Sequence, residues 1–466
     1  MVPGRWQAVL DELAPLTRCF EEAGYRIFLV GGTVRDLLAG GTGEEVDFDL
    51  TTDARPDAVE ALVRPGAEAV WLQGKRFGTI GCRIGGRDLE VTTHRAEVYA
   101  PESRKPEVRY ADAVEADLSR RDFTVNAMAL RLDAEAGPEL IDPFGGAADL
   151  AAGRLRTPLA PEVSFTDDPL RMLRAARFIA GHGLAPDAAL TEAVGRLHHR
   201  LEIVSAERIR AELDKLVVTA QPGPGLRFIT DTGLADEFLP ELPALALSED
   251  PAHRHKDVFA HTVAVVERAR PDRILRLAAL LHDIGKPKTR SFGPGSRVSF
   301  HHHEVVGARM ARERMQALRY PAADVAAVSR LVELHLRFHG YEEGAGGWTD
   351  SAVRRYVRDA GPLLRLLNEL TRADCTTRNQ RKAAELATRM DRLEERIDAL
   401  ARAESLAALR PELDGVQIME HLGVGPGQVV GEALAHLLEI RIEEGPLGED
   451  EARRRLDRWW ADRSTR

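Results

Sequence analysis

The sequence predicts a mixed α+β head followed by a mainly helical remainder. In roughly the first 150 residues, short apolar or alternating segments typical of strands are interleaved with segments of helical periodicity. From about Ser164 onward almost every segment has helical periodicity and the strand-like alternation disappears, which predicts a boundary near residues 145 to 160. A chain of 466 residues with 44% hydrophobic content is long enough for two to four domains with cores of their own.

The expected elements of the head follow one another in a regular order. Short runs bounded by glycine favour strands, whereas the glycine pair at 31 and 32 leads into a helical pattern. Gly85 and Gly86 suit the positive φ angles of a two-residue hairpin turn between two alternating segments. The sequence therefore predicts a strand at 25–30, a turn and helix at 31–40, a strand at 47–52 and a hairpin at 78–93.

Composition excludes several classes of protein. No apolar run approaches the roughly 20 residues of a membrane-spanning helix, and the N-terminal segment lacks the features of a signal peptide, so a cytoplasmic protein is expected. Cys19, Cys82 and Cys375 are far apart and predict neither a disulfide framework nor a zinc site. A net charge of −10 argues against indiscriminate coating of nucleic acid, although clustered arginines can still form a local phosphate-binding surface.

Three carboxylates in the head suggest a site for divalent metal. Asp47 and Asp49 are two positions apart on an expected strand, so their side chains should share one face. Glu90, on the second strand of the expected hairpin, is a candidate third carboxylate. Phosphoryl transfer needs such a cluster to hold metal ions, and Mg²⁺ prefers oxygen ligands of this kind. Taken alone, an Asp-x-Asp pair is more often solvated than catalytic, so its neighbours must decide.

The glycines upstream of these carboxylates strengthen the interpretation. Gly31 and Gly32 lie at a strand-to-helix turn, where backbone N–H groups can approach phosphate, and Arg35 follows in the first helical turn; an ordinary tight turn is an equal alternative. The segment LVGGTVRDLL followed by DFDL resembles the signature of polymerase β-like nucleotidyltransferases, and in particular their bacterial class II tRNA CCA-adding and poly(A) polymerase branch. The resemblance implies that Asp47 and Asp49 bind the catalytic metals and that Gly32 and Arg35 contact the incoming nucleotide.

Two arginine-rich segments extend the resemblance. RRDFTVNAM (120–128) is either a surface charge cluster or a holder of triphosphate and ribose, and its similarity to a family motif implies Arg121 as a nucleotide ligand and Asp122 as a ribose contact. DPFGGAADL (142–150) resembles the hinge between head and neck, with Gly145 and Gly146 expected to supply flexibility.

The second arginine-rich segment, TDDPLRMLRAARF (166–178), is expected to recognise the base. Its arginines recur every three residues in one basic stripe that includes Arg174 and Arg177. A carboxylate and a guanidinium held together can pair with the Watson–Crick edge of cytosine or adenine, whereas a helix cap at Asp168 with solvated arginines is the simpler alternative. The family carries EDxxR here, which implies selection of CTP and ATP by Asp168 and Arg171. Asp167 replaces the usual glutamate, which keeps the charge and shortens the side chain. SAERIRAEL (205–213) resembles the next neck motif, which implies that Glu207 and Arg208 support the helix that reads the base.

A second set of candidate metal ligands lies in the helical part. Histidine and carboxylate together suit Mn²⁺, Fe²⁺, Ni²⁺ or Zn²⁺, although isolated histidines seldom bind metal. The ordered set resembles the HD phosphohydrolase superfamily, which implies metal binding by four residues and matches at two further positions, with hydrolysis of phosphomonoesters or 2′,3′-cyclic phosphates as a second activity. The four are His261, His282, Asp283 and Asp374, and the two further ones are His303 and His335.

The resemblance covers nearly the whole chain and implies a division into four parts. These are a head (1–150), a helical neck that binds nucleotide and RNA (151–250), an HD domain (251–385) and a helical body and tail that binds RNA (386–466), where a Gly-Pro-Gly turn at 425–427 is expected to open a helix.

The leading hypothesis is stepwise addition of C, C and A to tRNA from CTP and ATP. The nearest rivals are a poly(A) polymerase and a partial enzyme that adds only CC or A. Residues 127–129, Ala-Met-Ala, lack the aromatics associated with the poly(A) form and favour CCA addition. An HD phosphohydrolase whose head only binds RNA is a rival of another class, and the intact Asp-Phe-Asp argues against it. The sequence leaves oligomeric state open.

Overall fold

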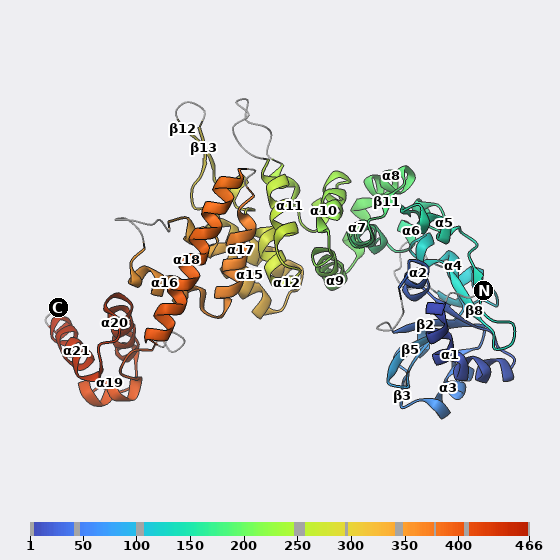
Figure 1. Cartoon of the computed structure of the whole chain (residues 1–466), viewed down its shortest axis with the longest axis horizontal. Coiled ribbons are helices and arrows are strands. Elements are labelled where there is room, and N and C mark those ends of the chain that lie inside the picture. Colours follow the sequence, from blue (N-terminus) through green and yellow to red (C-terminus); the bar gives the residue numbers. More distant parts are fainter. Residues whose placement is uncertain are drawn as a thin grey trace. The chain divides into compact units, whose positions relative to one another are not determined.

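The computed structural model describes residues 4–41, 47–98, 107–246, 257–293, 297–340, 348–376, 379–404 and 410–464. The chain divides into two compact units, Met1–Pro243 and Ala244–Arg466, and each is described by itself. The mixed sheet, in the blue and teal part of Figure 1, belongs to the first unit, and the second unit is almost entirely helical in its described residues. The predicted α+β class is therefore confirmed.

A seven-stranded mixed sheet forms the head, in the order β3-β4-β5-β2-β1-β8-β9. All neighbouring strands run antiparallel except β2 and β5, which are parallel. The strands are β1 (Ile27–Val30), β2 (Phe48–Thr52), β3 (Ala69–Trp71), β4 (Thr79–Ile84), β5 (Arg87–Thr93), β8 (Ala129–Leu132) and β9 (Glu139–Ile141), with β6 (Arg95–Val98) and β7 (Glu107–Tyr110) as a separate pair. The predicted strands and hairpin are confirmed, and Gly85 and Gly86 have φ angles of 60° and 78° in the turn.

Different helices pack on the two faces of this sheet. Alternate residues of β2 and β5, such as Phe48, Leu50 and Val91, pack into a core with the helices α1 (Gly4–Glu22), α2 (Gly32–Leu38) and α3 (Pro56–Val63). On the other face, Phe28 and Val30 of β1 pack against α4 (Val114–Ser119). Because side chains alternate along a strand, residues next to the core positions of β2 and β5 point away from the three helices. Asp49 and Glu90 are such residues.

The rest of the first unit is a helical neck. Gly145, with a φ of 73°, precedes α5 (Gly146–Ala151), and a Cβ added at Gly146 would lie 2.1 Å from the carbonyl oxygen of Thr124. Glycine at position 146 therefore allows the start of α5 to pack closely against the backbone at Thr124. The structure gives this steric reason for the glycine in place of the expected flexibility. The elements that follow are β10 (Arg154–Leu155), α6 (Pro161–Asp167), α7 (Leu170–His182), β11 (Ala185–Pro186), α8 (Ala188–Leu197), α9 (Ala206–Val217) and α10 (Pro222–Asp231).

The second unit contains the histidines and the tail. Its elements are α11 (Val258–Arg268), α12 (Arg273–Leu281), α13 (Lys286–Thr289), β12 (Arg290–Gly293), β13 (Arg297–Phe300), α14 (His303–Ala317), α15 (Ala322–Leu334), α16 (Asp350–Ala360), α17 (Leu364–Asp374), α18 (Gln380–Glu404), α19 (Gly415–Leu422), α20 (Gln428–Glu444) and α21 (Glu449–Ser464). The hairpin β12–β13 was not predicted, since no strands were expected after Ser164. Strands of four residues are too short for their alternation to be recognised among helical segments. Gly427 precedes α20, so the predicted Gly-Pro-Gly helix start is confirmed.

Candidate active site and metal centre

Asp49 and Glu90 lie side by side on the face of the sheet opposite α1 to α3. They are direct partners in the parallel ladder of β2 and β5, and both side chains are exposed. Asp47 precedes β2 by one residue, so the prediction that it lies on the strand is wrong: the ladder with β5 begins at Phe48. The pairing of β2 with β5 therefore positions Asp49 and Glu90, whereas Asp47 lies just before the first residue of β2.

The carboxylates influence one another's protonation. Desolvation raises the pKa of Asp49, the guanidinium of Arg121 opposes this rise, and the charge of Asp47 adds to it. Desolvation, Asp49 and then Asp47 raise the pKa of Glu90. Like charges gathered in this way are stabilised by a bound cation, and an all-oxygen donor set suits a hard divalent ion. Among the described residues, two groups of three possible metal ligands have their donor atoms within 4.8 Å of one another, and both groups lie in the second unit. The donor atoms of the head carboxylates are therefore more widely spaced than those of the second unit.

Gly31 allows an arginine to approach these carboxylates. Its φ of 75° and ψ of −138° are strained for any residue with a side chain, and a Cβ there would lie 3.1 Å from Nη1 of Arg121 and 3.4 Å from Oδ2 of Asp49. A Cβ at Gly32 would meet Nη2 of Arg35 at 3.5 Å. The turn therefore has a steric reason for glycine at position 31 that sequence alone could not reveal.

A fully buried carboxylate, Asp117 of α4, anchors two consecutive arginines. Its Oδ1 lies 2.5 Å from Nη2 of Arg120, and its Oδ2 lies 3.4 Å from Nη2 of Arg121. Burial would raise the pKa of Asp117, but the two guanidinium charges outweigh burial and lower it. Asp117 is thus a positioning residue that the sequence analysis did not identify, although its spacing of three and four residues from the arginines on a helix was a signal.

A chain of ion pairs joins Asp122 to the neck. Asp122 is buried and accepts hydrogen bonds from Nε of Arg174 at 2.9 Å and Nδ2 of Asn126 at 3.0 Å. Burial opposes ionisation, but Arg174 outweighs it and the pKa of Asp122 is lowered to about 2. Arg174 also lies 3.6 Å from Glu212 of α9, which binds Nε of Arg177 at 2.7 Å. The predicted stripe of arginines is therefore largely neutralised by carboxylates from two other elements.

Asp168 and Arg171 are held at the start of α7. Asp168 accepts hydrogen bonds from the N–H of Leu170 at 3.2 Å and from Nη2 of Arg208 at 2.9 Å, so it caps the helix and pairs with α9 at once. The buried guanidinium of Arg171 donates to Oγ of Ser164 at 2.9 Å and to the carbonyl oxygen of Arg120. The contact of Asp168 with the first N–H of α7 and the expected support from Arg208 are both seen, but Arg171 is buried and Arg174 is paired with Asp122, so the solvated arginines of the simpler alternative are not.

Two pockets border Asp49 and Glu90. The first, here called the arginine pocket, has a volume of about 350 Å³ and is lined by Val30, Asp49, Leu50, Thr79, Glu90, Thr92, Arg95, Arg120, Arg121, Asp122, Asp168, Leu170, Arg171, Arg174 and Arg208. The second, here called the acidic pocket, has a volume of about 450 Å³ and is lined by Asp47, Asp49, Trp71, Gln73, Gly74, Thr79, Gly81, Asp88, Leu89 and Glu90. Asp49, Thr79 and Glu90 line both.

Four of the predicted nucleotide-binding residues do not line either pocket. They are Gly31, Gly32, Arg35 and Arg177. Arg35 is buried, donates to Oδ1 of Asn126 at 2.8 Å and pairs with Asp36 at 2.8 Å. Because Asn126 in turn donates to Asp122, Arg35 in this arrangement supports the pocket through another side chain.

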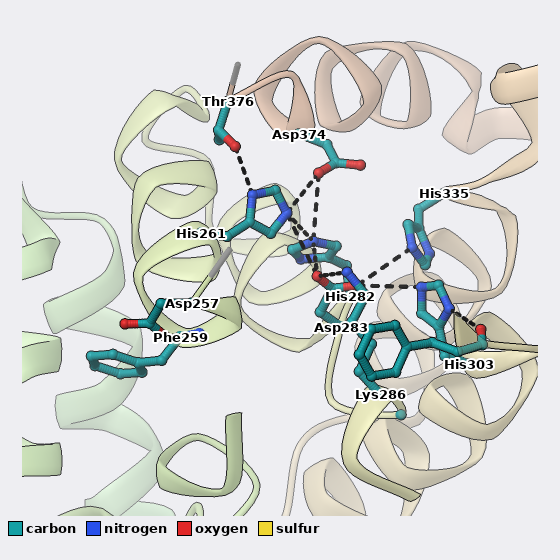
Figure 2. A network of polar contacts seen from close by, with 12 residues as sticks. Asp257, Phe259, His261, His282, Asp283, Lys286, His303, His335, Asp374 and Thr376 are labelled. Atoms are coloured by element: carbon teal, nitrogen blue, oxygen red, sulfur yellow. Dashed lines mark hydrogen bonds and ion pairs between the residues drawn. The ribbon is translucent and has the colours of Figure 1, made fainter. Parts of the chain in front are cut away.

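Four histidines and two aspartates of the second unit form one cluster, in which His282, Asp283, His303 and His335 are buried (Figure 2). Asp283 lies at its centre: its Oδ2 is 3.2 Å from Nε2 of His282 and 3.5 Å from Nε2 of His261, and its Oδ1 is 3.3 Å from Nε2 of His303 and 4.0 Å from Nε2 of His335. Asp374 approaches from α17, with Oδ1 2.9 Å from Nε2 of His261. All six residues predicted for this site therefore converge.

The cluster fits a transition metal by its donor orientation. Nδ1 of His282, His303 and His335 lies 2.7, 2.9 and 2.6 Å from a backbone carbonyl oxygen. A carbonyl only accepts, so Nδ1 of each ring carries a proton, and Nε2 faces the centre, where it can bind a metal once it carries no proton. Nε2 of His303 and of His335 are buried without a hydrogen-bond partner, and desolvation, the largest cause, lowers the pKa of His335 to about 3. Buried imidazole nitrogens without a partner around a carboxylate are ready metal ligands.

Close packing holds the motif in place. A Cβ at Gly285, two residues after Asp283, would lie 2.2 Å from the carbonyl oxygen of His303. Lys286, which the sequence analysis did not identify, places Nζ 2.6 Å from Oδ2 of Asp283. Glycine at 285 is therefore needed to bring the start of α14, and with it His303, against the His-Asp pair.

Comparison with known proteins places these sites in a family. Residues 27–156 match the model of the poly A polymerase head domain, residues 183–245 match the probable RNA and SrmB-binding site of polymerase A, and residues 257–401 match the HD domain. The A-adding tRNA nucleotidyltransferase of Deinococcus radiodurans is 34% identical over 449 residues, 92% of this chain and 95% of that protein. The chain belongs to the class II CCA-adding and poly(A) polymerase family. It is thus a nucleotidyltransferase with a head, an RNA-binding neck and an HD domain, and membership of this family implies metal ions.

Other members of the class II family differ in product. The CC-adding tRNA nucleotidyltransferase of Thermus thermophilus is 32% identical over 446 residues, 93% of each chain. The CCA-adding enzyme of Bacillus pumilus is 37% identical over 225 residues, 48% of this chain and 54% of that enzyme. The fold matches the crystal structure of the Bacillus stearothermophilus CCA-adding enzyme in complex with CTP, with a TM-score of 0.70 and 22% identity over 100% of both chains. Within the described part of this class II protein, no helix has the length and apolarity needed to cross a bilayer.

Proposed function

We propose that this class II nucleotidyltransferase extends tRNA 3′ ends and builds CCA from CTP and ATP. The observation that supports this best is the arginine pocket. Arginines from β6, the end of α4, α7 and α9 border one cavity with Asp49 and Glu90, and an aspartate and an arginine at the start of α7 are suited to pair with a base. The relatives that match along nearly the whole chain are tRNA nucleotidyltransferases, which favours tRNA as the acceptor.

The chain's own residues divide the work of nucleotidyl transfer. Asp47 and Asp49, with Glu90 beside them, would hold Mg²⁺, which when bound lowers the pKa of the 3′-hydroxyl and neutralises the departing pyrophosphate. The RNA 3′-oxygen attacks the α-phosphorus, forms the new phosphodiester bond and releases pyrophosphate. Arg121 binds the triphosphate from the side of Gly31, and Asp122 accepts from a ribose hydroxyl. Arg174 holds Asp122 ionised for that contact.

Base selection is assigned to Asp168 and Arg171. A carboxylate accepts from the exocyclic amine that cytosine and adenine share, and a guanidinium donates to an adjacent acceptor. In the structure Asp168 is paired with Arg208 and Arg171 with Ser164, so these partners hold the two side chains at the pocket wall before a base arrives. Gly31, Gly32, Arg35 and Arg177 complete the proposed nucleotide site as supporting residues around it.

A second activity is proposed for the HD cluster. His261, His282, Asp283 and Asp374 would hold a transition metal such as Mn²⁺, Fe²⁺, Ni²⁺ or Zn²⁺, with His303 and His335 as further ligands. Such an ion supplies an activated water for hydrolysis of phosphomonoesters or 2′,3′-cyclic phosphates at damaged RNA ends. The orphaned Nε2 atoms of His303 and His335 support this assignment, since buried polar atoms without partners are rare.

The four parts of the chain take distinct roles in this proposal. Residues 1–150 transfer the nucleotide, 151–250 select it, 251–385 carry the HD cluster, and 386–466 bind RNA. The start of α20 at Gln428, with its exposed N–H groups, is a contact for RNA phosphate in the last part.

A partial enzyme is a second candidate, and one observation favours it. The A-adding and CC-adding relatives described above match nearly the whole chain in sequence, whereas the CCA-adding enzyme of Bacillus pumilus matches about half of it. The products can be separated by offering tRNA that ends at the discriminator base or after CC, with CTP and ATP singly and together, and sequencing the ends. CCA from CTP plus ATP supports the leading proposal; A on the CC end alone, or CC without A, assigns a partial enzyme; a long A tail on varied RNAs assigns a poly(A) polymerase.

A further inference from the structure

A cross-strand row leads from the catalytic carboxylates to an aromatic side chain. Asp49 of β2 pairs with Glu90 of β5, Glu90 pairs with Gly81 of β4, and Gly81 pairs with Trp71 at the end of β3. Direct partners in a ladder present their side chains on the same face of a sheet. Trp71 therefore stands on the same face as Asp49, three strands or roughly 14 Å away at about 4.8 Å per strand.

The absence of a side chain at Gly81 lets the indole lean along this row. A Cβ at Gly81 would lie 3.1 Å from Cε3 of Trp71, so the ring covers the space that a side chain would fill. The guanidinium carbon of Arg83 lies 5.7 Å from the indole centroid and adds a cation–π contact that fixes the ring. Trp71 is nevertheless 36% exposed, which is unusual for so large an apolar side chain. The ring thus forms an open aromatic surface in the wall of the acidic pocket.

Charge distinguishes what the two pockets can hold. The arginine pocket suits a triphosphate, whereas the residues that line the acidic pocket include Asp47, Asp49, Asp88 and Glu90 and neither lysine nor arginine. The acidic pocket thus offers a triphosphate no cationic side chain in its lining, whereas the uncharged ribose and base of an RNA end need none. Nucleotidyl transfer brings two substrates to the same carboxylates, and the two pockets share Asp49 and Glu90.

We propose that the acidic pocket receives the 3′-terminal nucleoside of the acceptor RNA, with its base stacked on the indole of Trp71 and its 3′-hydroxyl directed to Asp49. Stacking on an aromatic ring accepts any base, because every base has a π face. This suits an acceptor whose terminal base changes after each addition. The inference rests on the proposed function and deepens it by separating the acceptor subsite from the nucleotide subsite.

The test uses the full-length protein and tRNA acceptors in steady-state kinetics. Trp71→Ala should raise the KM for the acceptor about tenfold and leave the KM for CTP or ATP unchanged, whereas Trp71→Phe should restore most of the affinity. Gly81→Ala, which crowds the indole without removing it, should weaken the acceptor in the same direction. Leu72→Ala is the matched control, since Leu72 is the exposed next residue and does not line the pocket. A rise in the KM for the nucleotide alone, or equal effects of Trp71→Ala and Leu72→Ala, would overturn the proposal.

A second measurement is independent of turnover. An acceptor with 2-aminopurine as its 3′-terminal base should lose fluorescence on binding the wild-type protein and not the Trp71→Ala variant, without any CTP or ATP present. An acceptor with an abasic 3′-terminal nucleotide should bind the wild type more weakly than the intact acceptor does. The Trp71→Ala variant should bind the two acceptors with equal affinity. If the protein adds no nucleotide to any RNA, the proposed function fails whatever the fluorescence shows. If it adds nucleotides and the quenching does not depend on Trp71, only the acceptor subsite is refuted.

Discussion

Asp117 offers the sharpest test of how the head positions its phosphate-binding arginines. It is fully buried beneath Arg120 and Arg121, whose side chains are 18% and 21% exposed. Asp117→Asn keeps the shape of the side chain and removes its charge, which leaves two guanidinium groups with weaker neutralisation. Breaking a buried pair by removing one partner costs about 3–5 kcal/mol, and because both arginines retain some solvent we expect about 3 kcal/mol.

In kinetics, Asp117→Asn should change the KM for the nucleotide. Arg121 is held between Asp117 and Gly31, so losing one charged hydrogen bond should raise the KM for CTP and ATP by about tenfold, or about 1.4 kcal/mol. Kinetics would be measured at saturating acceptor, and stability by urea unfolding with hydrogen exchange of Val114–Ser119 to report on the first unit.

Asp133→Asn is the matched control, because Asp133 is a head carboxylate that accepts from the backbone N–H groups of Glu135 and Ala136 and contacts neither arginine. An Asp117→Asn variant with unchanged nucleotide KM and unchanged exchange in α4 would refute the argument. A loss of stability without a change in the nucleotide KM would show that Asp117 is structural only.

Three further predictions test other parts of the molecule. Gly31→Ala should reduce transfer at least tenfold and destabilise the head by about 1–3 kcal/mol, because its positive φ is strained and its Cβ meets Arg121 and Asp49; normal activity in single-turnover assays would contradict this. Desolvation lowers the pKa of buried His94 to about 4, so the unfolded state takes up a proton first as the pH falls below 6.5, and between pH 7 and pH 5 stability should fall by about 2 kcal/mol. His94→Gln should flatten that part of the stability profile, and an unchanged profile would refute the assignment. His335→Gln should weaken Mn²⁺ binding in calorimetry by at least tenfold while nucleotide transfer persists, and unchanged binding would exclude His335 as a ligand.

Strand periodicity and motif spacing predicted those parts of the fold that depend on local sequence. The hairpin at Gly85 and Gly86 and the helix after Gly31 follow from backbone preferences that a few residues determine. The entrance of β2 was missed by one residue, because the end of a strand depends on where its partner begins to pair, and β5 lies some 40 residues away. The β12–β13 hairpin was missed because its strands are short.

In the candidate sites, too, some features were predictable from the sequence and others depend on tertiary packing. The six residues of the HD cluster were named from their order in the chain and converge as expected. The partners of the head arginines were not predictable: Glu212 meets Arg177 across 35 positions, and Asn126 meets Arg35 across 91. Such pairs depend on tertiary packing, which has no local period. The same holds for Trp71, whose place beside the carboxylates follows only from the register of four strands.

The central claim is that the head carboxylates and the arginine pocket perform nucleotide addition independently of the HD cluster. The most direct test incubates the wild type, Asp49→Asn and His282→Ala with Mg²⁺, CTP, ATP and tRNA lacking its 3′ CCA, and sequences the product ends. Extension by C and A residues in the wild type and His282→Ala, with none in Asp49→Asn, is the predicted result. Extension that persists in Asp49→Asn, or that disappears in His282→Ala while Asp49→Asn remains active, would contradict it.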